Sequence, residues 1–319
     1  MKIVFMGTPE FAVESLRALV EGGRQVVGVV TMPDKPVGKH QSVLQPSPVK
    51  QYAASVGLPV LQPEKLKDDA FLAQLASLKA DLQIVVAFRM LPEIVWNMPP
   101  LGTFNLHASL LPQYRGAAPI NWAIINGETE TGLTTFFLTH GMDMGKIILR
   151  KRIPIADTDD AGTLHDALMK QGAALALETL DQILAGKVDA IPQEQFYGDG
   201  SGLRPAPKIF KETCRIDWQW PLKKIYDFVR GLSPYPAAWT EWVQPDGSRL
   251  VLKLYRTEKC FDHHNLPAGT VCSDKKNYIH IAVEGGYLRL LSLQLAGKKR
   301  MDVADFLNGF KQTQGAIVE

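Results

Sequence analysis

The chain opens with MKIVFMGTPEFAVESLRALVEGGRQVVGVV (residues 1–30), and this stretch decides the fold class. Ile3–Met6 and Val26–Val30 are apolar runs with the length of buried strands, and apolar side chains recur at helical spacing between them. Thr8 is expected to cap this helix, and Gly22-Gly23 to end it. A strand, a helix and a second strand in this order predict an α/β fold with a mostly parallel sheet and crossover helices.

The same signals predict further elements as far as residue 189. Apolar runs predict strands at Leu82–Phe88, Thr103–His107, Thr131–Leu138 and Lys146–Ile153. Helical spacing and capping residues predict helices near residues 49–56, 68–79, 119–125 and 161–184. The connection over residues 31–45 has no apolar period, so it is expected to lack regular structure and to serve function.

Composition changes over residues 190–207, which are rich in glycine and proline and are interpreted as a linker. Beyond it, Leu222–Leu232 is predicted to be a helix, and four short strands are predicted at Arg249–Tyr255, Gly269–Val271, Tyr278–Val283 and Tyr287–Leu293. Strands of this length and spacing favour a small β-barrel. The expected organisation is therefore residues 1–189, a linker, and a domain over 208–319. Its core or domain-packing residues are expected to include Trp218, Trp220, Trp239 and Trp242.

The bulk composition excludes several classes of protein. With 319 residues, of which 46% are hydrophobic and 21% charged, the chain has the size and balance of a two-domain globular protein. The three cysteines lack CxxC spacing, which argues against a disulfide framework or a zinc site and favours a reducing cytoplasm. We expect no signal peptide, because residues 1–7 do not form a basic segment followed by a long apolar run, and no membrane span, because no run of 18 apolar residues occurs.

Charge is divided unevenly along the chain. Residues 1–203 hold 17 basic and 21 acidic side chains, a net charge of −4, whereas residues 204–319 hold 18 and 12, a net charge of +6. A basic C-terminal part can supply contacts to nucleic-acid phosphates, although ordinary surface scatter explains the same numbers.

The strongest candidate for a site is NLHASLLPQYRGAAP (residues 105–119). Asn105 and His107 are two residues apart in a predicted strand, so their side chains project from the same face. In open α/β sheets, ligands bind beyond the carboxyl ends of the strands, which is where this pair lies. We therefore interpret the amide and the imidazole as functional, although a single buried histidine is more often a core residue.

Asp143 follows the next predicted strand and lies between two glycines, which by itself is typical of a turn. Its position beside the strand of Asn105 and His107 makes a third catalytic role possible. An amide can donate to a developing oxyanion, an imidazole can accept a proton from an amine, and a carboxylate can orient that imidazole. Together the three side chains predict acyl transfer to an amine from an activated donor.

Other motifs are weaker. Neither the GxGxxG of a dinucleotide site nor the GxSxG of a serine nucleophile occurs. His263-His264, beside Asp262, is interpreted as a solvated loop in preference to a metal site, and no metal is expected.

At this point the chain resembles a known family, the methionyl-tRNA formyltransferases, over essentially its whole length. The resemblance rests on motifs at both ends of the chain and is strongest at the segment of Asn105 and His107 and at Gly141–Gly145; the other matching segments are Met6–Ala12, Pro33–Gly38, Arg215–Trp218 and Leu295–Lys299.

The resemblance implies a Rossmann-like formyltransferase domain carrying a smaller OB-like barrel. The implied donor is 10-formyltetrahydrofolate and the implied acceptor is the α-amine of methionine on initiator methionyl-tRNA, with Asn105, His107 and Asp143 as catalytic residues. The tetrahydrofolate-binding positions that match are Ser109, Leu110, Leu111 and Pro112, with Phe88 in a neighbouring wall that is one residue shorter than usual. The cations expected to contact tRNA are Lys35, Lys39, Lys50, Lys298 and Lys299. We expect a cytoplasmic monomer.

Three rival functions stay open. A related enzyme could formylate a small acceptor, such as an amino sugar or a glycinamide ribotide, and a hydrolase could cleave formyl-folate. A catalytically silent RNA-binding protein could also use this scaffold. The basic loop and C-terminal domain argue against a small acceptor, and the intact Asn105, His107 and Asp143 argue against a silent protein.

Overall fold

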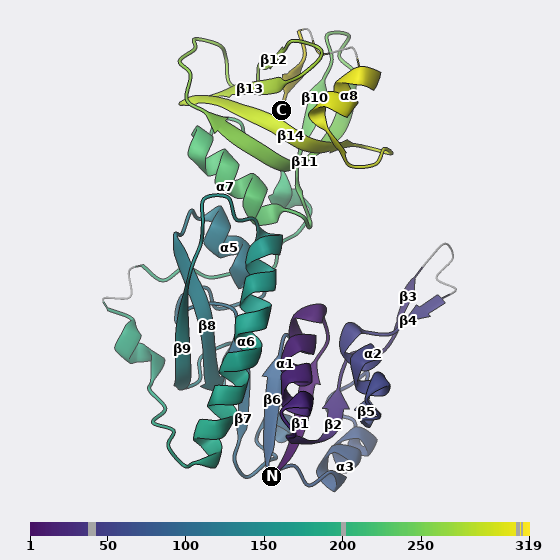
Figure 1. The fold of residues 1–319 in the computed structure, drawn as a ribbon, viewed down its shortest axis with the longest axis vertical. Helices are drawn as coiled ribbons and strands as arrows, with labels where there is room; N and C mark the ends of the chain where they lie inside the picture. Colours follow the sequence, from purple (N-terminus) through teal and green to yellow (C-terminus); the bar gives the residue numbers. More distant parts are fainter. Residues whose placement is uncertain (38–42, 199–201, 311–312, 314) are drawn as a thin grey trace. The chain divides into compact units, whose positions relative to one another are not determined.

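The computed structural model describes residues 1–37, 43–198, 202–310, 313 and 315–319. These residues fold into two compact units that alternate along the chain (Figure 1). The first unit comprises residues 1–116, 131–153 and 165–205, and the second comprises 117–130, 154–164 and 206–319. In the part of the chain that is described, no helix is long and apolar enough to cross a membrane.

The first unit is built on a seven-stranded sheet with the order β5-β2-β1-β6-β7-β8-β9. Its strands are β1 (Lys2–Gly7), β2 (Gln25–Val30), β5 (Val60–Leu61), β6 (Leu82–Val86), β7 (Thr103–His107), β8 (Glu130–Phe137) and β9 (Ile147–Pro154). The pairs among β5, β2, β1, β6 and β7 are parallel, and β7 pairs with β8 in the antiparallel sense. The predicted Rossmann-like, mostly parallel sheet is therefore confirmed.

Helices connect these strands, as Figure 1 shows, and the apolar runs of the strands are buried beneath them. The helices are α1 (Glu10–Glu21), α2 (Pro48–Ser55), α3 (Asp69–Ser77), α4 (Glu93–Trp96) and α6 (Ala161–Leu184). Asp68 and Ser47 cap α3 and α2 by accepting backbone N–H bonds. The predicted cap at Thr8 is wrong, because α1 begins at Glu10 with Pro9 at the N-cap and without a side-chain bond.

The connection over residues 31–45 has more structure than its sequence predicts. β3 (Lys35–Val37) and β4 (Val43–Gln45) form an antiparallel pair in which Lys35 lies opposite Gln45. The expectation that this connection lacks regular structure is therefore wrong for these residues: Pro36 lies opposite Leu44, and proline is tolerated in a two-stranded pair whose strands have free edges.

The second unit is an antiparallel sheet that nearly closes into a barrel. Its order is β12-β13-β14-β11-β10-β16, and β15 pairs with β14. Val318 N donates to Gly269 O and Val271 N donates to Ala316 O, so the last strand also bonds to the chain beside the first strand of the path. The strands are β10 (Ala238–Val243), β11 (Arg249–Cys260), β12 (Val271–Ser273), β13 (Ile279–Val283), β14 (Gly286–Leu295), β15 (Met301–Asp302) and β16 (Ile317–Val318).

Three helices belong to this unit: α5 (Pro119–Ile125), α7 (Leu222–Leu232) and α8 (Val303–Gly309). Helix α7 is amphipathic and contributes Ile225 and Val229, both fully buried, to the barrel core. Helix α5 packs against α7 at Gly231, where an added Cβ would lie 2.7 Å from Ile125 and 3.1 Å from the carbonyl oxygen of Asn121. The absence of a side chain at residue 231 therefore permits this close approach.

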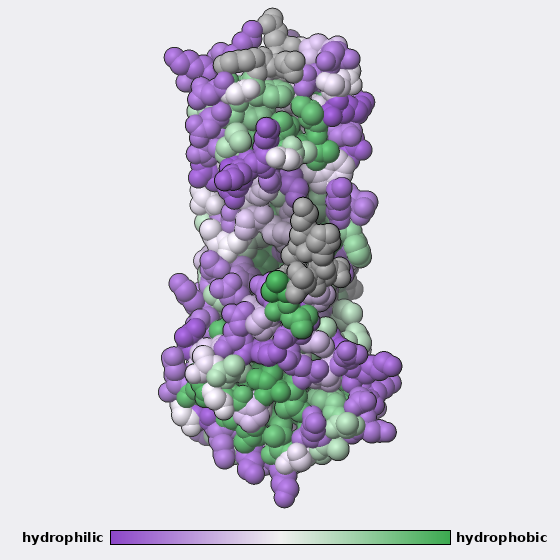
Figure 2. All heavy atoms as spheres, turned by 90° about the vertical axis from the view of Figure 1, so that its right-hand side faces the viewer, coloured by the Kyte–Doolittle hydropathy of each residue, from purple (hydrophilic) through white to green (hydrophobic). Residues whose placement is uncertain are grey.

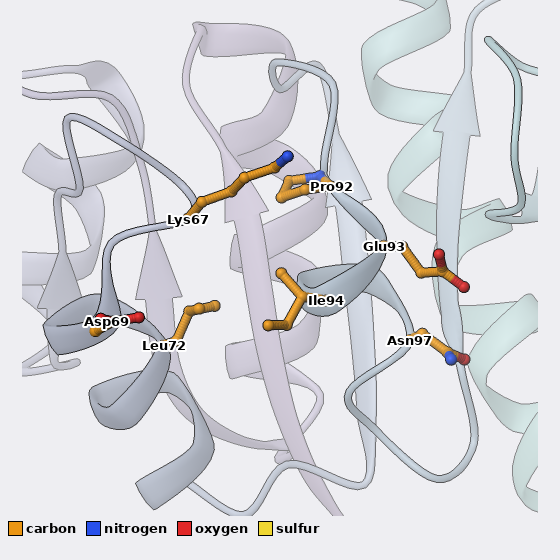
Figure 3. A pocket seen from close by; sticks show the side chains of 7 residues that line it. All are labelled: Lys67, Asp69, Leu72, Pro92, Glu93, Ile94 and Asn97. Carbon is orange, nitrogen blue, oxygen red and sulfur yellow. The ribbon is translucent and has the colours of Figure 1, made fainter.

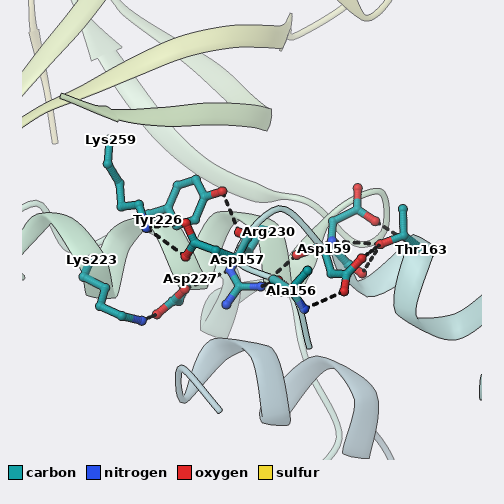
Figure 4. A network of polar contacts seen from close by, with 10 residues as sticks. Ala156, Asp157, Asp159, Thr163, Lys223, Tyr226, Asp227, Arg230 and Lys259 are labelled. Carbon is teal, nitrogen blue, oxygen red and sulfur yellow. Dashed lines mark hydrogen bonds and ion pairs between the residues drawn. The ribbon is translucent and has the colours of Figure 1, made fainter. Parts of the chain in front are cut away.

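A polar network joins α7 to the segment that follows β9 (Figure 4). Arg230 Nε donates to Asp227 Oδ1 at 2.8 Å, and Arg230 Nη1 donates to the carbonyl of Asp159 at 2.8 Å. Both charged side chains are buried. Nearby, Lys259 Nζ lies 2.7 Å from Asp157, and its hydrogen bond lowers the pKa of that carboxyl. Buried charges that are paired in this way fix the segment to the second unit.

Candidate active site

Strand β7 holds Asn105 and His107 at its carboxyl end, between β6 and β8. Asn105 lies opposite Val85 on one side and Phe136 on the other, and His107 lies opposite Thr134. His107 is buried, whereas Asn105 is half-buried. The Asn105 amide has no hydrogen-bond partner among the described residues. It is therefore available to a ligand, as expected for a donor to substrate.

One contact determines which nitrogen of His107 carries the proton. His107 Nε2 lies 2.9 Å from the carbonyl oxygen of Tyr114, which can only accept. Nε2 is therefore the donor, and the neutral ring presents the lone pair of Nδ1 as its basic atom. Tyr114 adopts a φ of +60°, which turns its carbonyl toward the imidazole.

Asp143 faces this basic atom from the loop between β8 and β9. Its Oδ2 is 3.9 Å from His107 Nδ1 and accepts a 3.0 Å hydrogen bond from the N–H of Gly116. The side chain is largely buried, and the backbone has a φ of +54°. A separation of 3.9 Å exceeds a hydrogen bond, so the pair can share a proton through a bridging water or a substrate atom.

The structure thus brings together the three predicted catalytic side chains, and each has the chemistry that acyl transfer needs. A free amide donor lies two strand positions from a basic imidazole nitrogen, and a carboxylate faces that nitrogen. No nucleophilic side chain is required for this chemistry when the acyl donor is activated.

The segment Ser109–Pro112 is held tightly against β8. Ser109 Oγ donates to Gln113 O at 2.6 Å, and Thr134 Oγ1 links Ser109 O at 2.7 Å to Leu111 N at 3.1 Å. Leu111 is fully buried and packs with Phe136 and Ile147, and Leu110 is half-buried. The predicted folate contact would therefore use mainly the backbone and the exposed part of Leu110, and it stays a prediction.

Phe88 is half-buried beyond the end of β6 and packs against the buried cluster that includes Val85 and Leu91. Its neighbour Arg89 places its guanidinium carbon 5.7 Å from the Phe88 ring and donates to the carbonyls of Glu64 and Pro63. Burial lowers the pKa of Arg89. Arg89 therefore links Phe88, which is predicted to contact folate, to the backbone of residues 63 and 64.

An open pocket of about 810 Å³ lies on another part of the first unit, between α3 and α4 (Figure 3). It is lined by Lys67, Asp69, Leu72, Pro92, Glu93, Ile94 and Asn97. None of the predicted catalytic residues lines this pocket, so its volume does not make it the candidate active site. Glu93 Oε1 lies 3.5 Å from Nε2 of the exposed His140, which precedes the Asp143 loop.

Lys35 of β3 and Lys50 of α2, two of the cations predicted to contact tRNA, differ in their surroundings. Lys35 is exposed, whereas Lys50 Nζ donates to Asp34 Oδ2 at 2.6 Å, and Gln62 holds the other oxygen of that carboxylate at 2.8 Å. Lys39 lies outside the described residues. Val43 and Leu44 are exposed on β4, and Figure 2, which faces this side, shows small hydrophobic patches within a hydrophilic surface.

In the second unit, Lys298 and Lys299 are exposed in the turn after β14. The adjoining outer face of the sheet carries a cross-strand row of Trp239, Lys253 and Gln294 on β10, β11 and β14. Side chains in register on neighbouring strands share a face, so this row is continuous. Of the four tryptophans predicted to be core or domain-packing residues, Trp218 and Trp242 are buried, and Trp220 and Trp239 are partly buried and pack against the core of this unit.

Aromatic rings on this face carry cations. The Arg215 guanidinium carbon lies 5.4 Å from the Trp239 ring centre, and that of Arg300 lies 4.3 Å from Tyr255. Tyr255 Oη donates to Gln294 Oε1 at 2.6 Å, which joins this pair to the row. We call Trp239, Lys253, Tyr255, Gln294 and Arg300, with Lys298 and Lys299, the cationic face. Its cross-strand members have no local sequence signal, because β10 and β11 meet only in the folded sheet.

Among the described residues, no group of three or more His, Cys, Asp or Glu side chains could hold a metal ion. His264 is not a free ligand: its Nε2 lies 2.8 Å from the carbonyl of Gly286, and its Nδ1 accepts from Leu266 N. It thus fixes the loop before β12.

Comparison with known proteins identifies the family of the chain. The family model described as formyl transferase matches residues 1–180, and the one described as formyl transferase, C-terminal domain, matches residues 208–311. HypX from Aquifex aeolicus, solved in complex with tetrahydrofolic acid, is 18% identical with a TM-score of 0.64, covering 96% of this chain and 47% of that one. WlaRD, a sugar 3N-formyl transferase, is 18% identical with a TM-score of 0.63, covering 94% and 99%. These likenesses show a shared fold.

Curated relatives are much more similar. A methionyl-tRNA formyltransferase from Parabacteroides distasonis is 73% identical over 98% of this chain and 96% of its own length. One from Bacteroides thetaiotaomicron is 63% identical over 99% and 97%. Identity at this level over nearly the whole length confirms the resemblance seen in the motifs, and the chain belongs to the methionyl-tRNA formyltransferase family.

Proposed function

We propose that this enzyme transfers the formyl group of 10-formyltetrahydrofolate to the α-amine of methionine on initiator methionyl-tRNA, for use in translation initiation. The observation that carries the proposal is the arrangement of Asn105, His107 and Asp143, with a free amide and a basic Nδ1 at one strand end. Family membership supplies the donor and acceptor classes.

The proposed reaction needs only these side chains and the two substrates. The methionine nitrogen forms a bond to the formyl carbon, and the bond from that carbon to N10 of the folate breaks. Asn105 donates to the formyl oxygen as it gains charge, which stabilises the tetrahedral intermediate. His107 Nδ1 accepts the proton that the amine loses and returns it to the departing N10, while Asp143 stabilises the imidazolium between these steps.

We propose that tRNA is held by two surfaces. One is the segment that carries Lys35, Lys39 and Lys50, and the other is the cationic face with Lys298 and Lys299. Cations stacked on aromatic rings suit a polyanion that also carries stacking bases. The folate is expected to contact Ser109–Pro112 and Phe88. We also propose a cytoplasmic monomer with the domain ranges 1–189 and 208–319 joined by 190–207.

The decisive experiment supplies the protein with 10-formyltetrahydrofolate and one acceptor at a time. We expect formyl-methionine on charged initiator tRNA and no product with an amino-sugar nucleotide or glycinamide ribotide. Formylation of a small acceptor alone would overturn the proposal, and so would release of formate without acceptor as the sole activity. Light scattering of the same sample tests the monomer.

A further inference from the structure

A buried glutamine outside the three catalytic residues holds the Asp143 loop. Gln193 lies in the segment predicted to be a linker, at the start of a short 3-10 helix, and is 1% exposed. Its Nε2 donates to Asp143 O and to Gly145 O, each at 2.8 Å. Its Oε1 accepts from Arg115 Nη2 at 2.6 Å and from Arg115 Nε at 3.1 Å. Both hydrogens and both lone pairs of the amide are therefore used.

These bonds close a ring around the catalytic carboxylate. Gly116, the residue after Arg115, donates its N–H to Asp143 Oδ2 at 3.0 Å. Asp143 is thus held at two points: its carboxylate by Gly116 and its backbone carbonyl by Gln193. Gln193 in turn accepts from Arg115, which precedes Gly116 in the chain. Arg115 is itself fixed by a 2.7 Å bond to Tyr197 Oη. Because the carbonyl of Tyr114 holds His107, one tripeptide aligns both members of the acid–base pair.

The loop has little freedom to move elsewhere once this ring is formed. At Gly145, an added Cβ would lie 1.6 Å from the carbonyl oxygen of Phe137, so the backbone is in direct contact with the end of β8. The chain before Gln193 is also anchored, because Ile147 and Ile191 exchange two backbone hydrogen bonds of 2.8 Å. Asp143 is therefore placed by contacts that are spread over 78 residues of sequence.

We propose that Gln193 is a positioning residue for formyl transfer: it sets the distance between Asp143 Oδ2 and His107 Nδ1 through the ring with Arg115. It touches no reacting atom. The inference rests on the proposed function, since the reaction is where the alignment matters. A segment that looks like a linker in sequence thereby becomes part of the support of the active site.

The test compares two isosteric substitutions on the same short helix. Gln193→Met keeps the volume but removes all four hydrogen bonds, whereas Gln195→Met changes an exposed neighbour. Misplacement of a catalytic group by about 1 Å costs roughly 10²-fold in rate. We expect Gln193→Met to lower kcat by that order, to change KM for folate and for tRNA by less than about threefold, and to alter the shape of the pH profile of kcat. Gln195→Met should leave all three unchanged.

A second readout needs no substrate. Amide hydrogen exchange at Gly116 reports its bond to Asp143 Oδ2, and it should be faster in Gln193→Met than in wild type or Gln195→Met. If Gly116 exchanges faster in Gln193→Met but the wild-type protein does not formylate methionyl-tRNA, the proposed function is overturned and the hydrogen-bonded ring is still supported. Wild-type kcat, pH profile and Gly116 exchange in Gln193→Met would overturn the positioning role. A melting curve shows whether Gln193→Met loses kcat only because it unfolds. In that case Gln193→Glu, which retains the acceptors for Arg115 but loses both donors, repeats the test.

Discussion

His107 Nδ1 and Asp143 Oδ2 face each other at 3.9 Å, while the opposite ring nitrogen is fixed on the carbonyl of Tyr114. The imidazole therefore cannot rotate to offer its other nitrogen without losing a buried hydrogen bond. The reaction takes one proton from the amine acceptor and returns one to the amine leaving group. The site must therefore hold a single proton between these steps, and the imidazole with its facing carboxylate can hold it.

This relationship predicts that His107 and Asp143 act as one unit. His107→Ala should lower turnover by roughly 10²–10⁴-fold with the fold intact, because it removes the general base. Asp143→Asn keeps the shape but cannot stabilise an imidazolium, so activity should collapse while folate binding persists. The double variant should be scarcely worse than His107→Ala in a single-turnover assay. Strictly multiplicative losses would show that the two side chains act independently.

Asn105 is predicted to act on the transition state and not on substrate affinity. Asn105→Ala removes an amide that is unpartnered among the described residues, so the fold should lose little stability. Removal of one oxyanion donor typically costs about 10²–10³-fold in kcat. Steady-state kinetics should show this loss with KM nearly unchanged. A large rise in KM at normal kcat would instead assign Asn105 to ground-state binding.

Lys35 of β3 and Lys50 of α2 should have different roles. Lys35 is exposed, so Lys35→Ala should raise KM for methionyl-tRNA and leave the melting temperature unchanged. Lys50 is bonded to Asp34, whose pKa it lowers, so Lys50→Ala should disturb the base of the hairpin. Proteolysis near residue 45 is expected to be faster in Lys50→Ala only. Equal cleavage of both variants would contradict this division.

The cationic face should contribute salt-dependent binding without sequence preference. Loss of one phosphate contact reduces the slope of log affinity against log salt by about 0.7–0.9. We expect a reduction of this size for Lys299→Ala and for Lys253→Ala in filter binding with charged initiator tRNA. Lys276→Ala, in the turn between β12 and β13, serves as the exposed control. An unchanged slope in both variants of the face would place the RNA elsewhere.

The buried pair of Arg230 and Asp227 should be important for stability. Arg230→Met leaves the Asp227 carboxylate with Lys223 as a partner and strands the carbonyl of Asp159. Breaking a buried pair from one side costs about 3 kcal/mol or more. Urea unfolding should show this loss, whereas Lys276→Met should be within about 0.5 kcal/mol of wild type. A loss below about 1 kcal/mol would mean that water replaces the guanidinium at low cost.

Most of the first unit was predictable from local pattern. β7 and α6 begin and end where the sequence predicts, because apolar runs and long helical periods are unambiguous. The spacing of Asn105 and His107 predicted a shared strand face, and both residues lie in β7, while their functional role stays a prediction. The short β3–β4 pair was missed, since three-residue strands containing proline resemble loop, and β10 was missed despite its alternating AWTEWV.

The supports of the site could not be predicted in the same way. Gln193 lies in a stretch whose glycines and prolines indicate only a linker, and its partners are 48–78 residues away. Lys253 joins Trp239 through strand register, which depends on the closed barrel. Contacts of this kind follow from tertiary packing, on which sequence periodicity has no bearing.

The close approach of α5 to α7 at Gly231 limits how the second unit can be separated from the rest of the chain. A gene fusion that transplanted residues 208–319 onto another protein would carry α7 without the helix that covers Gly231, and would leave the Arg230 network without the carbonyls that it binds. The fragment 208–319 alone is therefore expected to be less stable than a fragment supplied together with residues 117–130 and 154–164, which restore both sets of contacts.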